Sequence, residues 1–160
     1  MTKSIILVGA NGSGKSTLGA KLSADLDLPY KHAGASPGDT AKAFDACLTQ
    51  ASLLESGIVL DRATPICRQV YEVPLSESEI LFLKLFANHM SKRSIIIHCV
   101  GQGKFSRKEY YPEGHYEEIV RSQEQIRTRY FEVLKDVPHI LYNWQTDRYC
   151  DLVEFLNEEL

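Results

Sequence analysis

The chain has 160 residues, a length at which a single domain with one hydrophobic core is expected. Its 18 basic and 21 acidic side chains leave a net charge of −3, which argues against nucleic acid as the main partner, because such binding depends on neutralising backbone phosphates. The four cysteines lack C-x-x-C or zinc-finger spacing, so free thiols are expected. The N-terminal apolar run, residues 5–8, is too short for a signal sequence or a membrane span, and we expect a cytoplasmic location.

Short apolar runs alternate with longer helical patterns along the chain. The expected strands are residues 4–9, 28–33, 57–61, 94–100 and 139–144, and the expected helices are residues 15–26, 39–56, 76–92, 113–136 and 149–160. Asp39 is a plausible N-cap, and Ser76 with Glu79 forms a capping-box pattern. Because the strands are continuously apolar and alternate with helices, the pattern predicts an α/β fold of three layers, α/β/α, with a five-stranded parallel sheet.

A glycine-rich segment follows the first expected strand. Residues 9–16, GANGSGKS, fit the pattern G-x-x-x-x-G-K-[ST] between a strand and a helix, as in a P-loop NTPase. Glycines let successive backbone N–H groups face one concavity, and the next helix adds the positive end of its dipole. Lys15 is expected to reach the β- and γ-phosphates, and Ser16 to bind Mg²⁺. The predicted contacts of ATP are Gly9, Asn11, Gly12, Ser13, Gly14, Lys15, Ser16 and Thr17.

This segment alone does not say where the phosphoryl group goes. A GTPase would carry an N-K-x-D motif, which the sequence lacks, and ATPase motors need a longer chain. A small kinase is the class that remains. We expect Lys15 to be an exposed loop residue whose removal leaves the fold intact.

The third expected strand ends in Asp61, and Arg62 follows directly. A carboxylate at this place can hold the Mg²⁺ shell or the acceptor, and a guanidinium can bind an anion through two parallel hydrogen bonds. The alternative is an ion pair on a surface loop. Asp61 and Arg62 are therefore candidate catalytic residues beside Lys15, and Asp61 joins Ser16 as a candidate metal ligand.

The phosphate loop, the strand ending in Asp61-Arg62 and the element Cys67-x-x-Val70-Tyr71 together resemble the thymidylate kinases, most of all their short phage-type members. These belong to the P-loop nucleoside monophosphate and deoxynucleoside kinase group. The resemblance implies a single P-loop kinase domain over residues 1–160 that transfers phosphate from Mg·ATP to a deoxynucleoside monophosphate. It implies that Arg62 binds the acceptor phosphate, and it suggests a homodimer. The family usually has serine where Cys67 stands.

A basic segment, residues 101–114, follows the fourth expected strand and carries Lys104, Arg107 and Lys108 between glycines. Kinases of this group close a basic lid that excludes water and places cations on the transferred group. Arg107 is the preferred phosphate contact and a fourth candidate catalytic residue, because a guanidinium fork suits phosphate. The alternative is a solvated basic loop.

Several aromatic residues allow two interpretations. Trp144 follows the last expected strand, where this group lines its adenine pocket, yet core packing is the commoner role of such a tryptophan. Phe44, Phe82 and Tyr71 are candidates to stack on an acceptor base, or members of the core. The helix at residues 79–90 is apolar on nearly every side, which predicts cover by a second subunit or by the lid and the last helix.

The sequence leaves two other functions open. A kinase acting on a hydroxyl of a deoxynucleoside, a small metabolite or a polynucleotide end would use a general base, and Asp61 could serve. A nucleotide-binding module without turnover would keep the phosphate loop alone. The presence of Lys15, Ser16, Asp61 and Arg62 together favours an enzyme.

Overall fold

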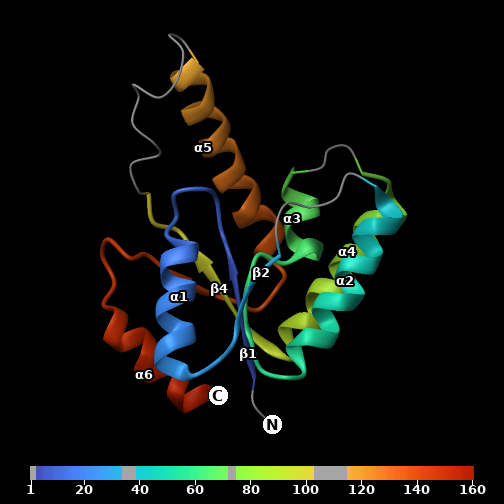
Figure 1. The fold of residues 1–160 in the computed structure, drawn as a ribbon. Helices are drawn as coiled ribbons and strands as arrows, with labels where there is room; N and C mark the ends of the chain where they lie inside the picture. The colour runs from blue at the N-terminus through green and yellow to red at the C-terminus, as the bar shows by residue number, and fades with distance from the viewer. Residues whose placement is uncertain (1–2, 34–38, 72–74, 103–114) are drawn as a thin grey trace.

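The computed structural model describes residues 3–33, 39–71, 75–102 and 115–160. Strands and helices alternate along most of the chain (Figure 1). The strands are β1 (Ser4–Val8), β2 (Tyr30–His32), β3 (Val59–Asp61), β4 (Ser94–Cys99) and β5 (Ile140–Tyr142). The helices are α1 (Lys15–Leu26), α2 (Thr40–Leu54), α3 (Thr64–Tyr71), α4 (Glu77–Ser91), α5 (His115–Leu134) and α6 (Tyr149–Glu159).

The five strands form one parallel sheet in the order β2-β3-β1-β4-β5, as predicted. Strand β1 lies at its centre, and its residues Ser4–Val8 are all buried, which explains why this strand is an unbroken apolar run after its first residue. The carboxyl ends of β1, β2 and β3 therefore lie side by side. This edge is where ligands bind in parallel sheets of this kind.

Helices cover both faces of the sheet and make the three predicted layers (Figure 1). On one face, α1 and α6 pack through residues such as Leu22 and Leu156 against Ile5 and Leu7 of β1. On the other face, helices α2 to α5 pack on alternate residues of the same strands. The phosphate loop and α1 thus stand on a sheet that is fixed from both sides.

Helix α3 is the element that the sequence pattern did not predict. It has eight residues and begins at Thr64-Pro65, and proline in the first helical turn needs no N–H partner. The two predicted N-caps are confirmed, because Asp39 accepts a hydrogen bond from Lys42 N and Ser76 accepts one from Glu79 N. The Glu79 carboxylate, however, accepts from Thr40 Oγ1 at 2.8 Å instead of completing a capping box.

The cysteines are free, as predicted, and three of them are buried. Cys67 lies in the core with its Sγ 3.7 Å from the Tyr130 hydroxyl, so this residue of α3 contacts α5. Among the described residues, no helix has the length and apolar character needed to cross a bilayer.

Candidate phosphate-binding and catalytic site

The phosphate loop joins β1 to α1 and leaves the start of that helix open. Gly9, Gly12 and Gly14 all have positive φ, and Gly14, with φ of 87°, is the N-cap residue of α1 without a side-chain cap. Four backbone N–H groups at a helix start have no partner inside the helix, so an uncapped start offers donors to an anion. The Ser13 hydroxyl is also buried without a partner among the described residues. The loop therefore has the geometry of a phosphate cradle.

Lys15 is buried, and the expectation of an exposed loop lysine was wrong. It is the first residue of α1 and is only 7% exposed. Its Nζ donates to Gly9 O at 2.8 Å and to Ala10 O at 3.3 Å. Burial lowers the pKa of Lys15, and the nearby Arg62 lowers it further. The loop carbonyls thus hold a cation at the place where a polyphosphate would need one.

Ser16 and Asp61 lie in contact, as their joint prediction as metal ligands requires. Ser16 Oγ donates to Asp61 Oδ2 at 3.1 Å, which connects the start of α1 to the end of β3. The Asp61 side chain is fully buried, and its Oδ1 has no partner among the described residues. A hydroxyl, a carboxylate and an unused carboxylate oxygen are the oxygen ligands that Mg²⁺ prefers.

The described residues contain no group of three or more His, Cys, Asp or Glu side chains that could hold a metal ion. This absence is compatible with Mg²⁺ bound to Ser16 and Asp61, because Mg²⁺ usually keeps several waters and is held by one or two protein ligands plus substrate phosphates.

Arg62 adopts a backbone conformation that is unusual for its residue type. Its φ is 75°, while its N–H donates to Leu7 O at 2.9 Å and so continues the contact of β3 with β1. Such a conformation costs on the order of 1 kcal/mol or more and is typical of functional sites. The guanidinium donates to Asn11 Oδ1 at 3.0 Å, and its Nε is buried without a partner among the described residues. Arg62 is therefore placed over the phosphate loop.

Helix α2 fixes the segment that follows Arg62. The buried side chain of Gln50 accepts from Thr64 N at 2.8 Å and donates to Thr64 Oγ1 at 2.8 Å. Both hydrogen bonds are buried, so losing them would leave polar groups unsatisfied. Gln50 was not singled out from the sequence, where an isolated glutamine on a helical pattern gives no signal.

One cavity of about 260 Å³ brings the predicted residues together. Its lining comes from the phosphate loop, the start of α1 and the ends of β2 and β3, namely Asn11, Gly12, Gly14, Lys15, Ser16, Thr17, His32, Asp61 and Arg62. The two separate motifs of the sequence thus form a single site.

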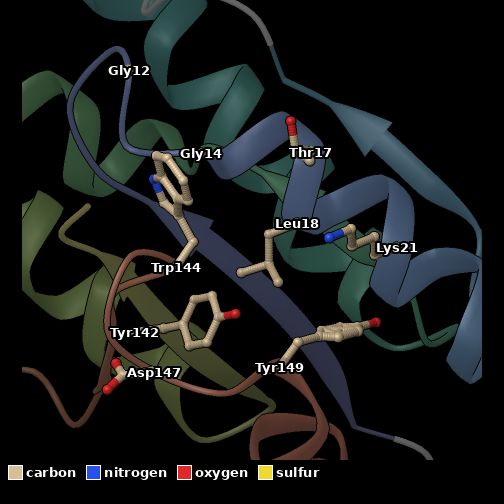
Figure 2. A pocket seen from close by; sticks show the side chains of 9 residues that line it. All are labelled: Gly12, Gly14, Thr17, Leu18, Lys21, Tyr142, Trp144, Asp147 and Tyr149. Carbon is tan, nitrogen blue, oxygen red and sulfur yellow. The ribbon is translucent and has the colours of Figure 1, made fainter. Parts of the chain in front are cut away.

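A larger cavity, of about 440 Å³, lies beside this site between α1 and the loop after β5. Figure 2 shows Trp144 beside the phosphate loop, with Leu18, Tyr142 and Tyr149 around the same space. Trp144 is 50% exposed and lies so near the loop that a Cβ added to Gly14 would be 2.8 Å from its ring. Of the two interpretations of Trp144, core packing is wrong.

The other predicted residues lie elsewhere. Phe44 and Phe82 contact each other with ring centroids 3.9 Å apart, on α2 and α4. Neither lines the two cavities described above. The lid residues Lys104, Arg107 and Lys108 lie outside the described residues.

No protein-family model and no curated protein matches the chain. Solved structures do resemble it. The YorR protein of Bacillus subtilis, in complex with phosphorylated GDP, matches with a TM-score of 0.67 and 21% identity over 96% of this chain and 95% of that chain. A deoxyadenosine kinase of M. mycoides, with dCMP and dCDP bound as products, matches with a TM-score of 0.52 and 17% identity over 98% and 97%. A shikimate kinase of Acinetobacter baumannii, in complex with shikimate, matches with a TM-score of 0.50 and 14% identity over 99% and 93%. The chain therefore has the fold of P-loop kinases.

Proposed function

We propose that the protein is a Mg·ATP-dependent kinase that phosphorylates a deoxynucleoside monophosphate, as the resemblance to thymidylate kinases implies. The observation that carries this proposal is the single cavity in which Lys15, Ser16, Asp61 and Arg62 meet at the open start of α1. This set supplies the cations and donors that phosphoryl transfer needs, and the acceptor phosphate brings its own anionic nucleophile. Catalysis then rests on positioning and charge neutralisation, with no dedicated general base.

The triphosphate of ATP would lie in the phosphate loop. Lys15 would turn from the carbonyls of Gly9 and Ala10 to the β- and γ-oxygens, whose charge grows during transfer. Ser16 and Asp61 would hold Mg²⁺, which neutralises charge on the phosphates when it is bound. Arg107, outside the described residues, stays our proposed lid contact to the transferred group.

The aromatic cavity would hold the adenine base. Trp144, Tyr142 and Tyr149 provide flat apolar surfaces next to the phosphate loop, and the cavity is close enough to share Gly12, Gly14 and Thr17 with the phosphate site. Stacking on an aromatic ring suits a purine without requiring a specific hydrogen-bond pattern.

We predict that ATP alters the fluorescence of Trp144 and that Trp144→Ala raises the KM for ATP about 10-fold, because one stacked base is worth about 1–3 kcal/mol. Trp144 is the only tryptophan in the chain, so the emission reports this pocket alone. The KM for the acceptor should change less than the KM for ATP. An emission spectrum that saturating ATP leaves unaltered would remove Trp144 from the nucleotide pocket.

Arg62 is the proposed acceptor-phosphate contact. Its buried Nε has no partner among the described residues, so the guanidinium has a donor available for an anion beside its bond to Asn11. The phosphorylated GDP in one of the similar structures supports a nucleotide as a ligand of this fold. The dCMP that the deoxyadenosine kinase holds as a product would instead come from a deoxynucleoside acceptor, which belongs to the second candidate function.

A kinase acting on a hydroxyl is the second candidate, because a deoxyadenosine kinase and a shikimate kinase share the fold. Such an enzyme needs a base for the hydroxyl proton, and Asp61 was the candidate. In the structure Asp61 is fully buried, and its Oδ2 already accepts hydrogen bonds from Ser16 and Tyr30. Asp61 lines the cavity, and its remaining oxygen, Oδ1, is assigned above to Mg²⁺, so the proposed metal site leaves no Asp61 oxygen to take the hydroxyl proton. Measuring ATP consumption with mixed acceptors separates both kinases from a module that only binds nucleotide.

We also propose a homodimer formed through α2 and α4. Leu48, Leu81 and Leu85 are about 60% exposed, and Leu81 and Leu85 share one face of α4 because they are four residues apart. Sedimentation velocity should show a dimer for the wild type and a monomer for the double variant Leu81→Glu, Leu85→Glu. A monomeric wild type at micromolar concentration would contradict this proposal.

A further inference from the structure

Tyr30 contacts the proposed metal site from a strand that the sequence motifs do not include. It is the first residue of β2, and its hydroxyl donates to Asp61 Oδ2, the same oxygen that accepts from Ser16 Oγ. In the sheet, β2 pairs with β3 so that His32 lies beside Asp61 and Tyr30 beside Val59. Tyr30 thus stands two residues before the position that pairs with Asp61, and its phenol extends along the sheet edge to the end of β3.

Gly19 on α1 makes this reach possible. A Cβ added at Gly19 would lie 2.4 Å from Tyr30 Cε2 and 3.0 Å from Cδ2. Real Cβ contacts are never that short, so any larger residue would displace the ring. Glycine inside a helix is less favourable than alanine, and the close approach of the Tyr30 ring explains why glycine stands at this position.

The two hydroxyls together fix the Asp61 carboxylate. With Ser16 and Tyr30 both donating to Oδ2, rotation of the carboxylate would break two hydrogen bonds to a buried charged group. The Ser16 hydrogen is thereby committed to Asp61, which leaves the lone pairs of Ser16 Oγ for a cation. A phenol hydroxyl is protonated at neutral pH, so Tyr30 is the donor in this hydrogen bond.

We propose that Tyr30 is a positioning residue for the pair that holds Mg²⁺, Ser16 and Asp61, and that Gly19 is required to admit its ring. Tyr30 itself touches neither metal nor substrate in this arrangement. The inference rests on the proposed Mg·ATP site.

The test measures how strongly a divalent cation strengthens nucleotide binding, which needs no turnover. ADP is titrated calorimetrically with and without Mn²⁺, and the ratio of the two dissociation constants is the metal coupling. In Tyr30→Phe the coupling should fall about 10-fold, as expected for losing one hydrogen bond to a charged group, while the metal-free affinity for ADP stays within about twofold. A general loss of structure would weaken both affinities.

Tyr130→Phe is the matched control. It removes the hydroxyl of a buried tyrosine that contacts Cys67 instead of Asp61, and it should leave the coupling unaltered. Gly19→Ala should lower the coupling in the wild type yet add nothing in the Tyr30→Phe background, because both changes act through the same contact.

A Tyr30→Phe protein whose metal coupling stays within twofold of the wild type would overturn the inference. Additive effects of Gly19→Ala and Tyr30→Phe would also overturn it. Failure of the proposed function looks different, because the wild type itself would then show no metal coupling and no turnover of ATP.

Discussion

Lys15→Ala should lower kcat about 100-fold or more, as removing one preorganised donor to the developing charge does in other enzymes. Lys15 is the buried cation at the open start of α1, and no other described cation takes its place on the carbonyls of the phosphate loop. Steady-state kinetics with saturating ATP and acceptor measures the effect. Lys92→Ala, at an exposed position where α4 ends, is the control and should keep wild-type turnover.

The fold should survive Lys15→Ala even though Lys15 is buried. Burial lowers the pKa of Lys15, which means that keeping its amine charged at neutral pH opposes folding, and alanine removes that opposition. The loss of the two hydrogen bonds from Lys15 to loop carbonyls, in contrast, lowers the stability of the fold. We therefore expect a Tm within about 4 °C of the wild type, equivalent to roughly 1 kcal/mol. Near-wild-type kcat in Lys15→Ala would remove the phosphate loop from the mechanism.

Arg62→Lys should raise the acceptor KM and lower kcat, with a combined loss of about 10-fold or more in kcat/KM for the acceptor. Lysine keeps the charge but loses the planar fork that binds a phosphate through two parallel hydrogen bonds. Lysine and arginine tolerate the positive φ at position 62 equally well. The variant therefore differs from the wild type in its side chain and not in its backbone. Arg93→Lys, in an exposed ion pair with Glu55, is the control.

The kinetic constant that changes in Arg62→Lys distinguishes an acceptor that carries a phosphate from one that offers a hydroxyl. Because Arg62 also contacts Asn11 of the phosphate loop, it is placed within reach of the ATP phosphates as well. If the acceptor carries a phosphate, the defect falls on acceptor kinetics and the KM for ATP is nearly unaltered. A raised KM for ATP with an unaltered acceptor KM would instead assign Arg62 to ATP and contradict a monophosphate acceptor.

The order of strands and helices was predictable because the strands other than β2 lie in largely apolar runs next to turn residues. Strand β2, with the sequence YKH, is exposed and gave a weaker signal. Helix α3 was not, since eight residues are too few to show helical periodicity. The site could be predicted only where a motif marks it. The cradle at residues 9–16 and the pair Asp61-Arg62 were identified, and the structure brings them into one cavity.

The parts of the site that escaped prediction depend on contacts between distant residues. Tyr30 joins Asp61 across 31 positions, and Gln50 joins Thr64 across 14. Neither residue belongs to a motif, and each is an ordinary member of a strand or helix by pattern. The sequence left Trp144 with two interpretations, a lining of the adenine pocket or the commoner core packing, and the chain after β5 brings it beside Gly14.

The most direct test of the central claim incubates the protein with γ-labelled ATP, Mg²⁺ and a panel of acceptors, and identifies the labelled product. The panel contains dTMP and other deoxynucleoside monophosphates, thymidine and other deoxynucleosides, a sugar acid, and DNA with a free 5′-hydroxyl. We predict label in a deoxynucleoside diphosphate, with dTMP preferred over thymidine. Label in thymidine, the sugar acid or the DNA end in preference to every monophosphate would contradict the proposed acceptor, and the absence of label from all acceptors would contradict a kinase.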